Sequence, residues 1–168
     1  VPERITPAQG EEVRQRMRGM IRTSDIRAFY PEVLITYATG PRPGLDAEGT
    51  GPGMFYALWL AQILAQACIA SFSGLCVGGG LDWKMFLDKL GGPRSRCKWL
   101  IVVQTKALYN SRPCLEEIFT ATQNGVRVLP VLFEGDALHA KQWPKVGASD
   151  ITGTEWRHVV RRSFGRVN

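Results

Sequence analysis

The stretch Trp99-Leu-Ile-Val-Val-Gln-Thr-Lys-Ala-Leu-Tyr-Asn-Ser-Arg-Pro-Cys-Leu-Glu-Glu-Ile-Phe-Thr-Ala121 decides the fold class of this chain of 168 residues. It joins a continuous apolar run, typical of a parallel strand buried on both faces, to a helical pattern that opens with two carboxylates. In open α/β sheets, ligands bind in the crevice outside the carboxyl ends of the strands. Glu116 and Glu117 follow such an end after one short loop, so we expect one of them to be catalytic.

Strand and helix patterns alternate along the rest of the chain. The expected strands cover residues 33–37, 72–77, 99–104 and 126–133, and the expected helices cover residues 55–71, 82–90 and 112–123. Asp82 is expected to cap the second of these helices, and Gly91-Gly92-Pro93 to end it. Strands 99–104 and 126–133 are both apolar throughout, which predicts that helices cover both of their faces. The alternation predicts an α/β fold with a doubly wound parallel sheet.

Residues 1–29 are expected to form an N-terminal helical extension, and residues 30–168 the main domain. Thr6-Pro7 is typical of a helix start, and the residues that follow are amphipathic, with Glu11 and Glu12 expected in the first turn and arginines later. This helix either supports the sheet or links the domain to an upstream module.

Composition limits the class of protein and of partner. A hydrophobic content of 45% suits one folded domain. The net charge of +6 comes largely from arginines near the two ends, which are either solvated or meet an acidic partner. No aromatic residues alternate with these arginines to form a stacking platform, so we do not expect a nucleic-acid partner.

Four cysteines lack C-x-x-C pairs and histidines at metal-ligand spacing, which predicts reduced, structural thiols and no metal site. No signal peptide is recognisable, and Gln62 and Gln66 interrupt the longest apolar stretch, residues 54–70. We therefore expect no membrane segment and a cytoplasmic location. The Gly- and Pro-rich loop of residues 38–53 matches neither the G-x-G-x-x-G fingerprint nor the P-loop.

Four segments resemble, in the same order, segments of the Toll/interleukin receptor (TIR) domain family. Ser111-Arg-Pro-Cys-Leu-Glu-Glu-Ile118 is similar to the family's Ser-x-x-Cys-Leu-x-Glu-[Leu/Ile] run. Glu32-Val-Leu-Ile-Thr-Tyr37 resembles its first strand, Asn124-Gly-Val-Arg-Val-Leu-Pro-Val-Leu-Phe133 its fourth strand, and Glu155-Trp-Arg-His-Val-Val160 its last helix. The resemblance implies a flavodoxin-like TIR fold of about five strands. The fifth strand would then either be short or be hidden within residues 145–152.

One branch of this family cleaves the bond between nicotinamide and ribose in NAD, and the resemblance implies that Glu117 carries that activity. Positive charge builds on the ribose as nicotinamide leaves, and a carboxylate beside the anomeric carbon stabilises it. Nicotinamide leaves neutral, so neither a metal nor a histidine is required. Glu116 points about 100° away on a helix, so only one of the two can face the crevice. The alternative role for Glu117 is an N-terminal helix acid that favours the dipole.

The resemblance also implies residues that bind the nucleotide, although this sequence departs from the family at several of them. Tyr37 matches the aromatic end of the first strand, but Ala38 replaces the basic residue that often follows, which leaves Arg42 to meet a phosphate. Gly80 and Trp83 fit the spacing of the loop after the second strand, which here is shortened and lacks its acidic residue. Trp143 either stacks on adenine across a contact between protomers or packs against its own chain. Three tryptophans are expected to anchor the core, and for Trp83 this is the alternative to a role in the loop: Trp83, Trp99 and Trp156.

Three functions follow. The first is a TIR NAD glycohydrolase, with NAD as substrate rather than cofactor, activated by self-association in a signalling or innate immune defence pathway. The second is a non-enzymatic TIR module that scaffolds signalling through contacts with other TIR domains, which Ala38 and the shortened loop favour. The third is a nucleoside-processing transferase, which also places a glutamate at an anomeric carbon.

Overall fold

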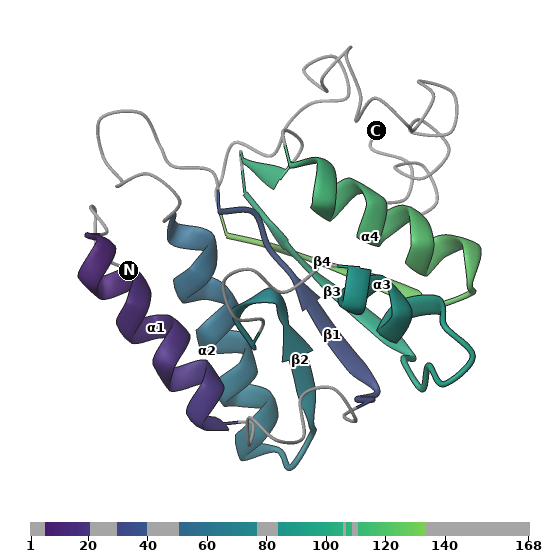
Figure 1. Ribbon diagram of the computed structural model, residues 1–168, viewed down its shortest axis with the longest axis horizontal. Helices are drawn as coiled ribbons and strands as arrows, with labels where there is room; N and C mark the ends of the chain where they lie inside the picture. Colours follow the sequence, from purple (N-terminus) through teal and green to yellow (C-terminus); the bar gives the residue numbers. More distant parts are fainter. Residues whose placement is uncertain are drawn as a thin grey trace.

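The computed structural model describes residues 6–20, 30–39, 51–76, 84–105, 107–108 and 111–133. In this part of the chain the sheet has four parallel strands in the order β2-β1-β3-β4, namely β1 (Val33–Thr36), β2 (Ser71–Ser73), β3 (Trp99–Gln104) and β4 (Arg127–Leu132). The helices are α1 (Pro7–Met20), α2 (Pro52–Gln66), α3 (Lys84–Gly91) and α4 (Arg112–Gln123), with a 3₁₀ turn, η2 (Gly74–Cys76). Helices α1 and α2 lie on one side of the sheet, and α3 and α4 on the other (Figure 1).

The predicted α/β class and the parallel sheet are confirmed. The bounds predicted for β3 and α4 are those observed, and the fully buried side chains of Leu100, Val102 and Val103 explain the apolar run. The strand order changes direction between β1 and β3, because the chain passes from β1 to β2 on one side and then returns to β3 on the other. The predicted fifth strand, within residues 145–152, lies outside the described residues.

Two elements differ from the predicted bounds by three residues or more, whereas β1, β4 and the end of α3 differ by one residue. Helix α2 begins at Pro52, because proline suits the first helical turn, where its missing N–H is not needed. It ends at Gln66, ahead of a turn in which Cys68 adopts a φ of 57°. Strand β2 pairs with β1 only from Ser71 to Ser73, and the chain then enters η2, so the strand is shorter than residues 72–77.

The prediction that helices cover both faces of β4 is wrong for the described residues. Leu129 is 45% exposed and Leu132 is 52% exposed, although their side chains leave the strand on alternate faces. Strand β4 pairs with β3 and forms one edge of the described sheet. An edge position explains how an apolar strand sequence can remain partly exposed on both faces.

Trp99 is not a core anchor, contrary to the prediction. It begins β3 at the end of the strand that lies away from α4's first turn, and it is 38% exposed. The guanidinium carbon of Arg127 on β4 lies 5.1 Å from the centre of its ring. The indole therefore packs under a cation at the sheet surface.

Helix α1 has the predicted start but not the predicted charge pattern. The Gln9 N–H donates to Thr6 Oγ1 (3.2 Å), and the Thr6 N–H donates to Gln9 Oε1 (2.8 Å), which together form a reciprocal cap. Because the helix begins at Pro7, Glu11 and Glu12 fall beyond its first turn. The helix contacts α2 and η2, so it forms an outer layer beside α2 (Figure 1).

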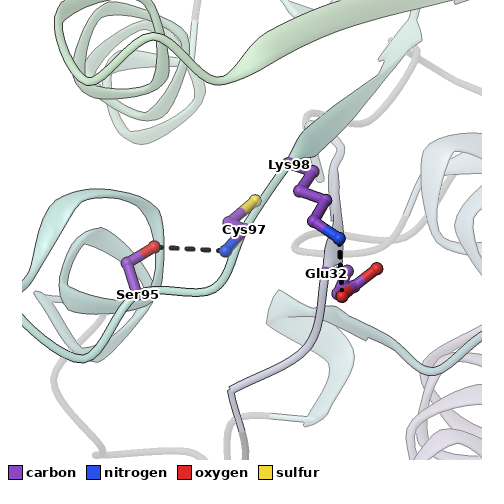
Figure 2. A network of polar contacts seen from close by, with 4 residues as sticks. All are labelled: Glu32, Ser95, Cys97 and Lys98. Atoms are coloured by element: carbon purple, nitrogen blue, oxygen red, sulfur yellow. Dashed lines mark hydrogen bonds and ion pairs between the residues drawn. The ribbon is translucent and has the colours of Figure 1, made fainter.

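A small polar network joins β1 and β3 where both strands begin (Figure 2). Lys98 Nζ lies 2.8 Å from Glu32 Oε1, and the backbone N–H groups of Lys98 and Trp99 donate to the Glu32 carbonyl oxygen. Nearby, Ser95 Oγ accepts a hydrogen bond from the Cys97 N–H. These contacts define the amino edge of the sheet, opposite the edge at which a ligand is expected.

Candidate active site

Glu117 lies in α4 at the carboxyl edge of the sheet, and its side chain is almost entirely buried, at 8% exposure. The helix begins at Arg112, so both Glu116 and Glu117 fall beyond the first turn and do not open the helix as predicted. The helix dipole interacts strongly with carboxylates only within that first turn. Carboxylates are also mostly exposed in proteins, whereas Glu117 is buried. The structure therefore gives little support to a purely helix-stabilising role.

Thr36, the last residue of β1, meets Glu117 across the interior. Its hydroxyl Oγ1 donates a hydrogen bond to Glu117 Oε2, and Thr36 itself is 1% exposed. The two residues are 81 positions apart in the sequence. Thr36 ends β1, and Glu117 lies in α4, the helix that follows β3. Strands β1 and β3 are the neighbours between which the strand order changes direction. This is the point in a doubly wound sheet where ligands bind.

Burial dominates the electrostatics of the Glu117 carboxyl. Desolvation raises its pKa from 4.5 to about 8, the Thr36 hydrogen bond opposes that rise, and the charge of Glu116 adds to it. The unliganded carboxyl is therefore mostly protonated at neutral pH. A cation placed beside it would favour the ionised form and lower its pKa.

Cys114 lies one turn before Glu117 on the same face of α4 and is buried. Burial and, to a smaller extent, the Glu117 charge raise the pKa of its thiol to about 12, while hydrogen bonds with Ser111 and Thr36 oppose that rise. The thiol is thus an unreactive packing group, as predicted. Cys76 is also buried and Cys97 partly so, whereas Cys68 is exposed in the turn after α2.

Glu116 differs from its neighbour, as expected for adjacent residues on a helix. It is partly exposed, whereas Glu117 is buried, so only Glu117 is directed into the interior. Position in the fold therefore separates the two candidate carboxylates in the way that helix geometry predicts.

Tyr37 contacts a different group of residues from those around Glu117. A Cβ atom built at Gly53 would lie 3.6 Å from the Tyr37 ring, and one built at Gly74 would lie 3.8 Å from it. Its ring therefore lies between the first turn of α2 and η2, whereas Thr36 is directed at α4. Successive side chains leave a strand on opposite faces, which accounts for the separation. These contacts place the Tyr37 ring on the α2 side of β1, whereas Glu117 lies on the α4 side.

The other predicted binding residues, Arg42, Gly80, Trp83 and Trp143, lie outside the described residues. Within the described part of the chain, no group of three or more His, Cys, Asp or Glu side chains is arranged to hold a metal ion. The described helices are all too short or too polar to cross a bilayer.

Buried hydroxyls lie at the carboxyl ends of three neighbouring strands, and the sequence had not indicated them as part of a site. These are Thr36 on β1, Ser73 on β2 and Thr105 directly after β3. Thr105 Oγ1 has no hydrogen-bond partner among the described residues. A buried hydroxyl without a partner costs on the order of 1–3 kcal/mol, so it is a natural place for a ligand group. The signal in the sequence is a Ser or Thr at the last position of these three strands or directly after it.

Comparisons with known protein families, with curated proteins and with solved structures found no match to this chain. The arrangement of the site therefore carries the functional argument. It consists of one buried carboxyl at the switch point of a parallel sheet and one hydroxyl that donates to it. Such a site can stabilise a positively charged centre that forms transiently beside Glu117.

Proposed function

We propose that this chain is a TIR-domain NAD glycohydrolase with Glu117 as its catalytic residue. The observation that carries the proposal is the buried Glu117 carboxyl, held by Thr36 where β1 and β3 present their carboxyl ends. Burial raises the pKa of this carboxyl to about 8, which disfavours its charged form and costs folding stability. Strongly perturbed carboxyls of this kind are concentrated at functional sites.

The proposed reaction uses this carboxyl only after a cationic substrate is bound. The positive charge of the nicotinamide ring lowers the pKa of Glu117, so the carboxylate forms when the substrate is present. The bond between the anomeric carbon and the ring nitrogen then breaks, and its electron pair leaves with neutral nicotinamide. Glu117 stabilises the oxocarbenium-like ribose, and water adds to the anomeric carbon and loses a proton to give ADP-ribose. Attack by a group within the same molecule would give a cyclic product instead.

The residues proposed to bind the nucleotide are assigned from the family resemblance. Tyr37 would bind the nucleotide from the α2 side of β1, Arg42 would meet a phosphate, and Gly80 and Trp83 would lie in the loop that covers the substrate. Trp143 would stack on adenine at a contact between protomers. Self-association in the cytoplasm would then complete the site and couple it to signalling or innate immune defence.

Release of nicotinamide from NAD tests the proposal. Wild-type protein at high concentration, with a crowding agent to promote association, is compared with Glu117→Gln and with Glu116→Gln as the matched control. We expect Glu117→Gln to lower the turnover rate at least ~100-fold, because the amide cannot carry the negative charge that the transition state requires. Glu116→Gln should retain most activity. Full activity in Glu117→Gln would contradict the proposal.

A non-enzymatic TIR scaffold is the second candidate, and one observation favours it. Glu117 is almost entirely buried in the described structure, so a substrate has little access to its carboxyl. If the wild type releases no nicotinamide under conditions in which light scattering shows that it associates, the scaffold function is supported instead.

A further inference from the structure

We infer that Thr36 is a positioning residue of this site: its hydroxyl, held at the end of β1, orients the Glu117 carboxyl toward the reacting centre. The role in turnover rests on the proposed NAD glycohydrolase function. The orientation of Glu117 by Thr36 is a property of the fold and can be tested without turnover.

The backbone register places Thr36 accurately. It is paired with Val102 in the parallel β1–β3 ladder, and both residues are buried. A residue at a paired strand position has little freedom in its backbone, and a β-branched side chain has restricted rotation about χ1. The Thr36 hydroxyl is therefore held in a fixed direction, which is what a donor must have in order to orient a carboxyl.

The Thr36 hydroxyl meets two groups on one face of α4. It donates to Glu117, and it also lies close enough to the Cys114 thiol to act against the effects of burial and of the Glu117 charge on the pKa of that thiol. Cys114 and Glu117 are three residues apart, so they project from the same side of the helix. Thr36 thus fixes the carboxyl from the strand while the thiol packs beside it.

In the described structure, few ionisable groups other than Thr36's neighbours on α4 affect the pKa of Glu117. On α4, Glu116 acts through its charge and Cys114 remains neutral because burial raises the pKa of its thiol. Lys89 on α3, which packs against α4, lies 4.7 Å from the centres of the Tyr30 and Phe72 rings.

Strands β1 and β3 contribute no further ionisable group to this contact among the described residues. Tyr37 is directed at α2 and η2, and Gln104 at the end of β3 is neutral. Removal of the Thr36 hydroxyl should therefore change the ionisation of Glu117 directly.

The test uses Thr36→Val, which keeps the shape of the side chain and removes the hydroxyl, and Thr36→Ser, which keeps the hydroxyl and removes the methyl. Thr122→Val is the matched control, because it removes a hydroxyl that bonds to the Ile118 carbonyl oxygen on the same helix. Two quantities are measured for each protein: kcat/KM for nicotinamide release as a function of pH, and the pKa of Glu117 from the NMR shift of its ¹³C-labelled side-chain carboxyl.

We expect Thr36→Val to raise the pKa of Glu117 by about one unit and to lower kcat/KM at neutral pH about tenfold, since hydrogen bonding favours the ionised carboxylate. Thr36→Ser should restore the wild-type pH profile, and Thr122→Val should not change it. If Thr36→Val does not fold, Thr36→Ala supplies the same comparison. A Glu117 titration and a pH profile that are both unchanged in the hydroxyl-free variant would overturn the inference.

The failure of the proposed function is distinguishable from the failure of this inference. If the wild-type protein releases no nicotinamide, the proposed glycohydrolase function is contradicted. The NMR titration then decides by itself whether Thr36 affects the pKa of Glu117. A loss of activity in Thr36→Val with an unchanged Glu117 titration would indicate a merely structural role for Thr36 and would also overturn the inference.

Discussion

The two edges of the sheet each contain a glutamate, and their surroundings shift the two pKa values in opposite directions. At the amino edge, Glu32 is exposed, and its hydrogen bond and ion pair with Lys98 lower the pKa of its carboxyl (Figure 2). At the carboxyl edge, Glu117 is buried without an ion pair among the described residues, and desolvation raises its pKa to about 8. The same functional group is thus ionised at one end of the strands and mostly neutral at the other.

This difference separates a structural contact from a candidate functional one. The Glu32–Lys98 pair connects the starts of β1 and β3 but remains in water, where ion pairs contribute little to stability. Glu117 makes folding less favourable at neutral pH, because its carboxyl has a lower pKa in the unfolded protein than in the folded protein. A carboxyl that costs stability at the edge where parallel sheets usually bind ligands supports the function that we propose for Glu117.

The largest predicted effect is the dependence of stability on pH at Glu117. Its pKa is raised from 4.5 to about 8 on folding, so the stabilising contribution of the bound proton is complete below the unfolded pKa and is lost as the pH rises through the folded pKa. Between about pH 5 and pH 7 the wild type should lose about 2.5 kcal/mol of unfolding free energy relative to Glu117→Gln. Urea denaturation of both proteins at several pH values measures this difference. Parallel curves would mean that Glu117 ionises normally in the folded protein.

An intermediate effect is expected from the packing at the carboxyl edge. A Cβ atom at Gly53 would lie 2.5 Å from the Ala38 carbonyl oxygen, so the start of α2 and the chain after β1 would have to separate. We expect Gly53→Ala to lower the unfolding free energy by about 2 kcal/mol, despite the higher helix propensity of alanine. Gly74→Ala is the control, since its Cβ would make only ordinary contacts with Tyr37, and it should change stability by less than about 0.5 kcal/mol. Equal effects would show that the close approach at Gly53 relaxes freely.

The smallest effect is expected at the amino edge. Glu32→Gln removes the ion pair with Lys98 but leaves the backbone hydrogen bonds to the Glu32 carbonyl oxygen in place. Because the pKa of Glu32 is lowered, the contribution of this pair is present above the unfolded pKa of the carboxyl and is lost as the pH falls. Salt should weaken it further. Denaturation at low and high salt and at several pH values measures these changes. If Glu32→Gln lowers the unfolding free energy as much as Gly53→Ala does, the amino edge matters to stability as much as the carboxyl edge, contrary to this prediction.

Sequence patterns predicted the fold class and the bounds of two elements, since both depend on nearby residues. The apolar run of β3 and the helical spacing of α4 predicted both elements with their observed ends. The bounds of β2 were less predictable, because pairing with β1 ends at Ser73 while the apolar sequence continues into η2. The exposure of Leu129 and Leu132 depends on which segments cover β4, which its own sequence does not record.

The candidate site was predictable only in part, because contacts between segments distant in the sequence are not recorded in the local pattern. Helix geometry predicted that one of Glu116 and Glu117 would face inward, and the family resemblance selected Glu117, which is the buried one. Nothing in the local pattern indicated that Thr36 would be its partner. Tyr37 was grouped with Glu117 by resemblance, yet its described contacts are with the first turn of α2 and with η2.

The sequence by itself determined an alternation of strands and helices and the place of a glutamate just after β3, because the periodicity of apolar side chains and the reach of a short loop are local properties. Only the tertiary structure decided that this carboxyl is buried, that a hydroxyl 81 residues away donates to it, and that its pKa rises to about 8. Those properties arise from the removal of water by segments distant in the sequence. Desolvation and long-range hydrogen bonds therefore exist only once the strands and helices have packed together.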